Sequence, residues 1–414
     1  MQGHFPVLGQ LARRAVTLPR IPNRCFGAIL LGLLCWQVGG AVPTWAADGP
    51  KPPSIAELRQ EVAGLAESLG ERQTRQRLIA IDDSLVGQFS AEVQALRASM
   101  LKMLGDAGED EDLWYLRSVF ESDTEFRDEA AHGLSLAAIK SPNDLQDWRF
   151  LIRSLPMLEG EQAVSVMKAL LRFRQRATNS HWIRRVILLG LKLPEEQQQV
   201  AIDLLRHWSG MQATESNGEQ RTTLASYQEW YRQKWPEEPT PEWPTEPAEG
   251  RWTYRKTKDL LETAAFSAEQ VQQGREVYVK TNCSKCHIKG NLGTAQGPNL
   301  SDIAAMRQRK ELLEAILFPS LELHEDFPSA TVVTLSGKIL TGLMSAEKDG
   351  NVRIVDINGQ AQTVARNEIE QLLPSLVSNM PTGALEPLST EELLALFAFL
   401  EFRENPQKPY HALE

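Results

Sequence analysis

The sequence predicts a mainly α protein: a helical-repeat array, then a second α domain that carries a small antiparallel β-meander insertion. Three observations predict this order. Apolar residues recur at helical spacing from Ser54 to Ser209, a proline-rich break follows, and four strand-like runs lie in the last third. A length of 414 residues, 42% of them hydrophobic, suits two or three domains. The net charge of −10 argues against a nucleic-acid binder, which needs clustered Lys and Arg.

Residues 1–47 have the order of a secretory signal peptide. Four arginines and no acid precede an apolar run over 26–36, and the small residues Ala46 and Ala47 follow. The run is shorter than the roughly 20 residues that span a bilayer, so we expect no transmembrane segment in the mature chain. We expect export to the periplasm or another extracytoplasmic space. Cleavage near Ala46 or Ala47 would remove the four arginines, which takes the net charge from −10 to −14, and it would also remove Cys25 and Cys35.

Residues 48–210 are predicted to form the helical-repeat domain. A capping box, Ser54-x-x-Glu57, opens the first amphipathic helix. A 34-residue spacing then recurs, which is typical of helix-hairpin repeats that stack because one repeat cannot bury its own apolar face. The array resembles HEAT-type repeats, and chance alignment within an all-helical region is the alternative. The positions in register are Trp114, Trp148 and Trp182, and also Leu136, Leu170 and Leu204.

Residues 211–258 are predicted to be a linker. Five prolines fall within residues 236–247, a density that no helix or central strand tolerates. We expect an extended, acidic connector, with Trp243 and Trp252 folded back on a neighbouring surface.

The remaining domain, 259–414, contains Cys283-Ser-Lys-Cys286-His287, the attachment pattern of c-type haem. Two thiols within about one helical turn can add to the two vinyl groups of a porphyrin, and the next residue places an imidazole under the iron. A thioredoxin-like dithiol would need a βαβ setting, and a zinc site would need a second cysteine pair. The sequence therefore predicts one covalently attached haem c, with iron bound by His287.

Two amphipathic helices are expected to frame this motif. One opens at Ser267-x-x-Gln270 and the other at Ser389-x-x-Glu392. Gly274 would let the two helices cross closely, with Tyr278 against Leu396 or Phe399; two unrelated amphipathic helices are the alternative.

A β insertion is predicted at about 328–366. Residues 331–335, 338–342, 352–356 and 360–364 alternate like strands, and Ser336-Gly337 and Asn358-Gly359 supply hairpin turns. The insertion could cover the haem, dock a partner, or be structural elaboration.

The sixth iron ligand has four downstream candidates. Met306 has the helical spacing of a core residue, Met344 ends a strand-like run, and His324 lies in an acidic loop. Met380 lies on an irregular loop just before the final helix.

Residues 267–403 resemble the haem-binding cytochrome c family described from planctomycetes and verrucomicrobia. The resemblance implies a cytochrome c-type α domain, a distal methionine at Met380, and a Pro298 carbonyl that accepts from the His287 ring N–H. Family members are often fused to helical repeats or to dehydrogenase-like propellers. The matching pieces are Gly274 followed by the Cys-Ser-Lys-Cys-His motif, Gly297-Pro298-Asn-Leu300, Ile316-Leu-Phe-Pro-Ser320, Gly337 with Gly342, Asn379-Met380-Pro381 and the terminal helix.

These observations predict an exported monohaem cytochrome that transfers single electrons, docked through its repeats. We expect an electron carrier with no catalytic residue, and a redox partner protein such as a periplasmic dehydrogenase or another cytochrome. Lys280, Lys285 and Lys289 could form a basic rim that steers an acidic partner. Two alternatives stay open: a haem enzyme (peroxidase or gas-binding) with an open sixth site, and a scaffold subunit of a periplasmic dehydrogenase complex.

Overall fold

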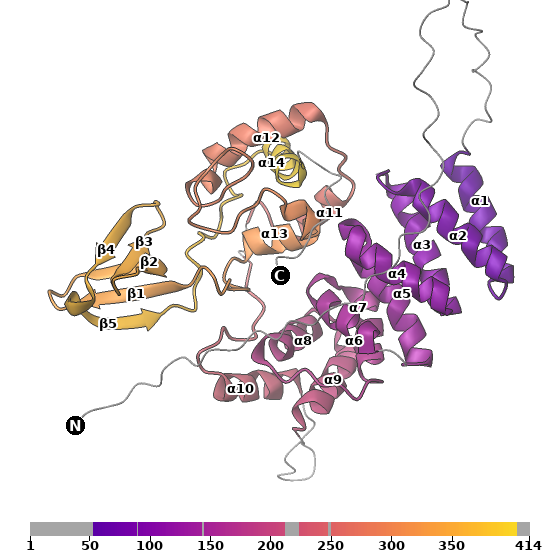
Figure 1. The fold of residues 1–414 in the computed structure, drawn as a ribbon, viewed down its shortest axis with the longest axis horizontal. Helices are drawn as coiled ribbons and strands as arrows, with labels where there is room; N and C mark the ends of the chain where they lie inside the picture. The colour runs from indigo at the N-terminus through magenta and orange to yellow at the C-terminus, as the bar shows by residue number, and fades with distance from the viewer. Residues whose placement is uncertain (1–52, 89, 143–144, 212–222, 247–249, 404–414) are drawn as a thin grey trace, which may run out of the picture. The chain divides into compact units, whose positions relative to one another are not determined.

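Local capping signals define where many of the helices begin. In the computed structural model the Ser54 hydroxyl accepts from Glu57 N and the Glu57 carboxylate accepts from Ser54 N, so the predicted capping box starts the first helix. The structure describes residues 53–88, 90–142, 145–211, 223–246 and 250–403 (Figure 1). The predicted signal peptide, 1–47, lies outside these ranges. Within them, no helix combines the length and apolar character needed to cross a membrane.

The N-terminal part is an array of helices around one hydrophobic core. Helices α3, α5, α7 and α9 contact one another in succession. Gly105 and Gly133 let α3 and α5 approach closely, because a methyl group on Gly105 would lie 2.2 Å from the Gly133 carbonyl oxygen. The helices are α1 (Ile55–Leu65), α2 (Arg72–Leu85), α3 (Ala91–Ala107), α4 (Asp110–Ser122), α5 (Arg127–Lys140), α6 (Leu145–Ser154), α7 (Gly160–Leu170), α8 (Ser180–Lys192), α9 (Gln199–Ser209) and α10 (Leu224–Lys234).

The 34-residue spacing corresponds to successive helix pairs, α4–α5, α6–α7 and α8–α9. The three tryptophans lie near the start of the first helix of each pair, and the three leucines lie in the second. Leu170 and Leu204 are fully buried, which explains why this position is apolar. Trp148 and Trp182 pack against the core, whereas Trp114 is 68% exposed.

The segment predicted as a linker packs against the array at its described positions. Helix α10 places Leu224, Tyr227 and Tyr231 in the core of the array, so that core continues past residue 210. Residues 236–246 form no regular element, and Arg184 of α8 donates to the carbonyls of Pro239 and Thr240. The proline-rich chain is thus bound to α8 instead of spanning open solvent.

The C-terminal domain, residues 252–403, has a second hydrophobic core. Its closest crossing is at Gly274, where a methyl group would lie 1.8 Å from the Ala395 carbonyl oxygen. The Tyr278 and Phe399 rings pack edge to face at 5.4 Å, which confirms the predicted pairing of the two helices. The helices are α11 (Tyr254–Glu262), α12 (Ala268–Lys280), α13 (Arg309–Leu317) and α14 (Thr390–Glu401).

The insertion is a five-stranded antiparallel sheet with the order β4-β3-β2-β1-β5 (Figure 1). The four predicted strands match β1–β4, but the insertion extends beyond residue 366 because β5 returns to pair with β1. Strand β5 was missed because it is almost entirely exposed and ends at a proline, so it shows no apolar alternation. The strands are β1 (Ser329–Thr334), β2 (Ile339–Ala346), β3 (Val352–Val355), β4 (Ala361–Val364) and β5 (Ile369–Pro374).

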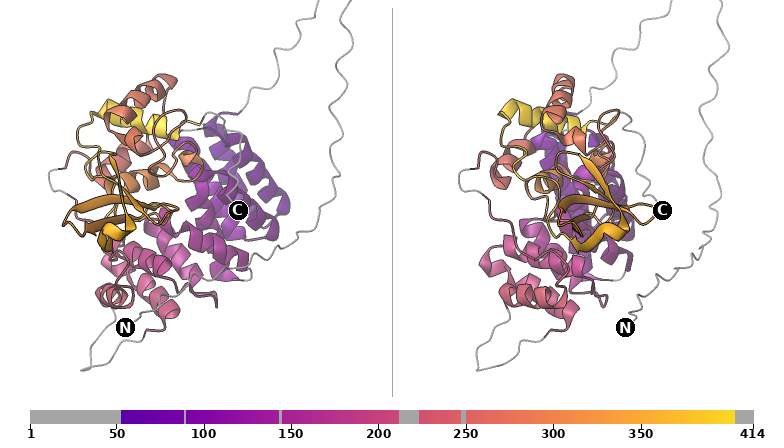
Figure 2. Two further views of the ribbon diagram at one scale, coloured as in Figure 1. Left: turned by 60° about the vertical axis from the view of Figure 1, so that its left-hand side comes forward. Right: turned by 90° about the vertical axis from the view of Figure 1, so that its left-hand side faces the viewer.

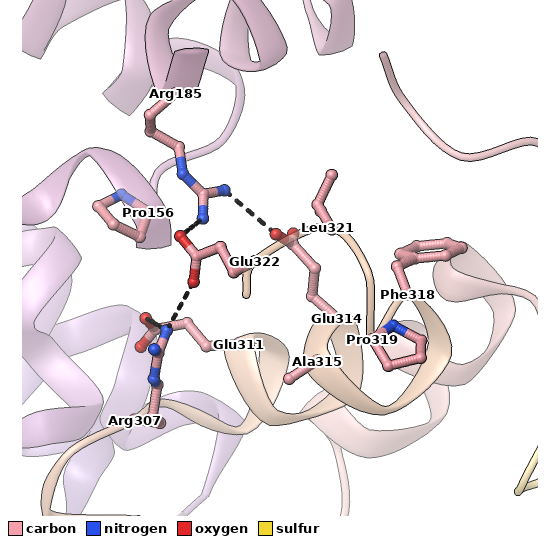
Figure 3. A pocket seen from close by; sticks show the side chains of 10 residues that line it. All are labelled: Pro156, Arg185, Arg307, Glu311, Glu314, Ala315, Phe318, Pro319, Leu321 and Glu322. Carbon is pink, nitrogen blue, oxygen red and sulfur yellow. Dashed lines mark hydrogen bonds and ion pairs between the residues drawn. The ribbon is translucent and has the colours of Figure 1, made fainter. Parts of the chain in front are cut away.

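The array and the C-terminal domain belong to one compact unit, residues 53–414. Charged side chains join the two. Buried Arg185 of α8 pairs with Glu314 of α13 at 3.2 Å and with Glu322 (Figure 3). Lys192, also of α8, pairs with Glu314 at 2.8 Å. Arg307 approaches Glu322 from the other side at 3.4 Å. The helices of the array, coloured indigo to magenta, and the orange strands of the sheet can be followed in both views of Figure 2. The C-terminal domain is therefore held by several ion pairs, not by the linker alone.

Candidate functional site

The cysteine motif follows directly from the end of α12. Asn282 adopts the left-handed conformation with φ 64°, a conformation that asparagine tolerates better than most residues, and this turns the chain out of the helix. A 3-10 turn, Cys283–Lys285, comes next, and the amides of Cys286 and His287 both donate to the Cys283 carbonyl. The two thiols and the imidazole are thus carried by one tight turn.

Both thiols are free and half-buried. Burial raises the pKa of the Cys283 thiol and that of the Cys286 thiol. Thr281 Oγ1 lies 3.2 Å from Cys283 Sγ and orients that sulfur. Because neither sulfur is in a disulfide, each can take one thioether bond.

The imidazole of His287 is oriented by the chain that returns beneath it. Its Nδ1 lies 2.8 Å from the Pro298 carbonyl oxygen, so Nδ1–H donates and Nε2 is the nitrogen left to bind a metal. Burial lowers the pKa of His287, which keeps the ring neutral, as a ligand must be. Gly297 lies against the ring, since a methyl group there would be 2.9 Å from His287 Cε1. Gln296 N and Gly297 N hold this segment by donating to the Cys286 carbonyl.

A tyrosine fixes the backbone of the motif to α12. The Tyr278 hydroxyl donates to the His287 carbonyl at 2.8 Å, while its ring packs against Phe399 of α14. Sequence reasoning assigned Tyr278 a packing role and missed this hydrogen bond. The sequence indicated Gly297 only as part of the Gly297-Pro298-Asn-Leu300 motif. The available signal was that Gly297 precedes Pro298, whose carbonyl was expected to bind the His287 ring.

The predicted basic rim is wrong at Lys289. Its side chain is buried, and its Nζ donates to the carbonyls of Leu400 at 2.7 Å and Phe402 at 2.9 Å. The ammonium group thereby satisfies carbonyls at the C-terminal end of α14 and stabilises the helix dipole. Lys280 pairs with Glu392, and Lys285 is exposed.

The four candidates for the sixth ligand lie in different surroundings. The core position expected for Met306 is wrong, since Met306 is 41% exposed. Met344 packs in the sheet, and His324 is exposed in its loop beside Asp326. Met380 is half-buried, and its amide donates to the Ser378 hydroxyl at 3.1 Å.

One family model covers this site. Residues 271–324 match the cytochrome c family. The match contains the whole attachment turn, Gly297, Pro298 and α13, and it ends before the β sheet and Met380. No curated protein matches the chain.

The cytochrome c domain carries one haem c, attached covalently and containing iron. The residues present fit that group by their donor chemistry: two free thiols in one turn, and a neutral imidazole whose Nδ1 is already engaged.

Proposed function

We propose that this protein is an exported monohaem c-type cytochrome that transfers single electrons through a haem ligated by His287 and Met380. The observation that carries the proposal is the orientation of His287 within the cysteine turn. Its Nδ1 is bound to the Pro298 carbonyl at 2.8 Å, which leaves Nε2 for iron.

Each residue of the site has a distinct role in this proposal. Cys283 and Cys286 hold the porphyrin through thioether bonds. The Pro298 carbonyl keeps His287 in one tautomer and makes the ring a stronger donor. The haem supplies an iron that cycles between the ferric and ferrous states. A thioether ligand from Met380 raises the reduction potential and closes the sixth position, which suits electron transfer more than oxygen chemistry.

The helical array acts, in this proposal, as a HEAT-like docking module for a redox partner protein, such as a periplasmic dehydrogenase or another cytochrome. Support comes from the ion pairs of Arg185 and Lys192 with Glu314, which are largely buried. A partner bound to the array would therefore be held at a set distance from the haem domain. Export follows from the signal-peptide pattern of residues 1–47.

Absorption spectroscopy tests the haem. The purified extracytoplasmic protein should give a pyridine haemochrome spectrum of haem c, and acid acetone should leave the pigment attached. A colourless protein, or one whose pigment is extracted, would overturn the proposal.

A pair of methionine variants tests the sixth ligand. The near-infrared band of methionine-bound ferric iron should be present in the wild type and lost in Met380→Ala. The matched control is Met306→Ala, which removes an exposed methionine and should leave the band unchanged. Persistence of the band in Met380→Ala would exclude Met380. Rapid carbon monoxide binding by the untreated ferrous protein would favour a haem enzyme with an open position.

A further inference from the structure

The β3–β4 hairpin lies next to both chain segments that carry the proposed iron ligands. At the end of β3, the Val355 carbonyl accepts from the side-chain amide of Asn379, the residue before Met380, at 3.3 Å. At the hairpin turn, Gly359 faces the attachment turn, because a methyl group added to Gly359 would come within 3.8 Å of the Lys285 carbonyl oxygen. The attachment turn and the Met380 loop, almost 100 residues apart in sequence, thus meet the same hairpin.

The hairpin turn is built to be stiff. The Asp356 carboxylate accepts from the amides of Asn358 and Gln360, both at 2.9 Å, and Gly359 N donates to the Asp356 carbonyl at 3.0 Å. Gly359 has φ 79°, which a glycine adopts without strain. Strand β3 is paired on both sides, with β2 and β4. The turn and the end of β3 are therefore held in a fixed position relative to each other.

The Met380 loop has few other ties. Among the described residues, Met380 N donates to the nearby Ser378 hydroxyl, and Ser378 N donates to the Ser320 hydroxyl at 3.0 Å. Val377 is 64% exposed, so apolar packing contributes little to this part of the loop. Asn379 provides the side-chain tie between the loop and the sheet.

We propose that the β insertion is a clamp that holds the Met380 loop in position relative to the His287 segment, with Asn379 as the positioning residue. This inference rests on the proposed His287 and Met380 ligation. Its consequence is kinetic and thermodynamic protection of the sixth position: a held loop keeps the methionine bound, whereas a released loop lets another ligand compete. The clamp gives the insertion a role that a mere elaboration of the fold would not have.

Two variants release the clamp at different points. Asn379→Ala removes the side-chain amide that donates to the Val355 carbonyl. The second variant replaces residues 356–360 by Asn-Gly, which joins the paired residues Val355 and Ala361 through a two-residue turn and keeps the strand register. The matched control is Asn351→Ala, because Asn351 is also half-buried and its side chain accepts a hydrogen bond from a backbone amide of the same insertion, Arg366 N.

The probe is imidazole added to the ferric holoprotein, followed with the near-infrared band. Loss of one hydrogen bond should tighten imidazole binding by roughly threefold to tenfold in Asn379→Ala, and the shortened hairpin should act in the same direction with a weaker band. Asn351→Ala should match the wild type. Wild-type imidazole affinity in both clamp variants, or an equal shift in the control, would overturn the clamp. A wild type without the band would instead refute the ligation itself.

Discussion

At Gly274 the addition of a single methyl group should destabilise the haem domain. In Gly274→Ala the new methyl group would lie 1.8 Å from the Ala395 carbonyl oxygen and 2.7 Å from Phe399 Cβ. Because the nearest atom belongs to the backbone, no side-chain rotation can relieve this clash. Helices α12 and α14 must therefore move apart by about 1.5 Å. Overpacking of this kind costs about 1–3 kcal/mol, and the rigid neighbour places this site near the upper end.

The assay is thermal unfolding of the holoprotein followed by Soret absorption, which reports on the haem domain. For a domain of about 150 residues, 3 kcal/mol corresponds to a midpoint roughly 6–12 °C lower. Gly64→Ala is the matched control, since Gly64 lies in α1 with no atom within 4 Å of the new methyl group. That variant should keep the Soret midpoint and stabilise α1 by about 0.5–1 kcal/mol.

An unchanged or raised Soret midpoint in Gly274→Ala would refute this reasoning. It would mean that α12 and α14 do not cross with backbone contact at this glycine, and that the attachment turn is supported in another way.

Three further predictions concern the haem domain and its junction with the array. Gly297→Ala should push the His287 ring off the Pro298 carbonyl and shift the reduction potential by roughly 20–60 mV; a potential equal to wild type in redox titration would contradict this. Lys289→Met should lower the free energy of unfolding of the haem domain by about 2–3 kcal/mol, because buried carbonyls lose a charged donor; denaturant titration that shows no loss would exclude the tie. Burial, reinforced by the nearby Glu401, raises the pKa of Glu125 from 4.5 to about 7. Ionising Glu125 therefore destabilises the fold, and stability should fall as pH rises from about 4.5 to 7. Glu125→Gln should remove that slope and add up to about 3 kcal/mol at pH 8, whereas an equal gain at pH 4 and pH 8 would point to another cause.

The features that sequence reasoning predicted well are local ones. Capping boxes at Ser54, Ser267 and Ser389 begin helices in the structure, because the bonds that make them span only three residues. Strands β1, β3 and β4 were predicted within two residues of their observed bounds, whereas β2 continues to Ala346, four residues past its predicted end. Strand β5 lacks both apolar alternation and a glycine turn, as only Ile369 packs against the small core of the sheet.

The errors arose where a distant partner decides the environment. The spacing of Met306 resembles that of a buried helix residue, yet its carbonyl faces the array, where it accepts from Arg127, and its side chain is exposed. Lys289 looked like a surface charge beside the motif, but its Nζ donates to the Ser301 carbonyl and to two carbonyls more than 100 residues later in the chain. A single sequence contains no local pattern that reports such contacts.

The amino-acid order by itself determined the chemistry of the attachment turn and the helical periodicity of the array, because both depend on residues within one or two turns of each other. Tertiary structure alone decided that Gly297 faces the His287 ring, that Asn379 reaches β3, and that Arg185 joins the array to α13. Those contacts exist only after separate elements have packed, since they depend on which faces meet and at what distance.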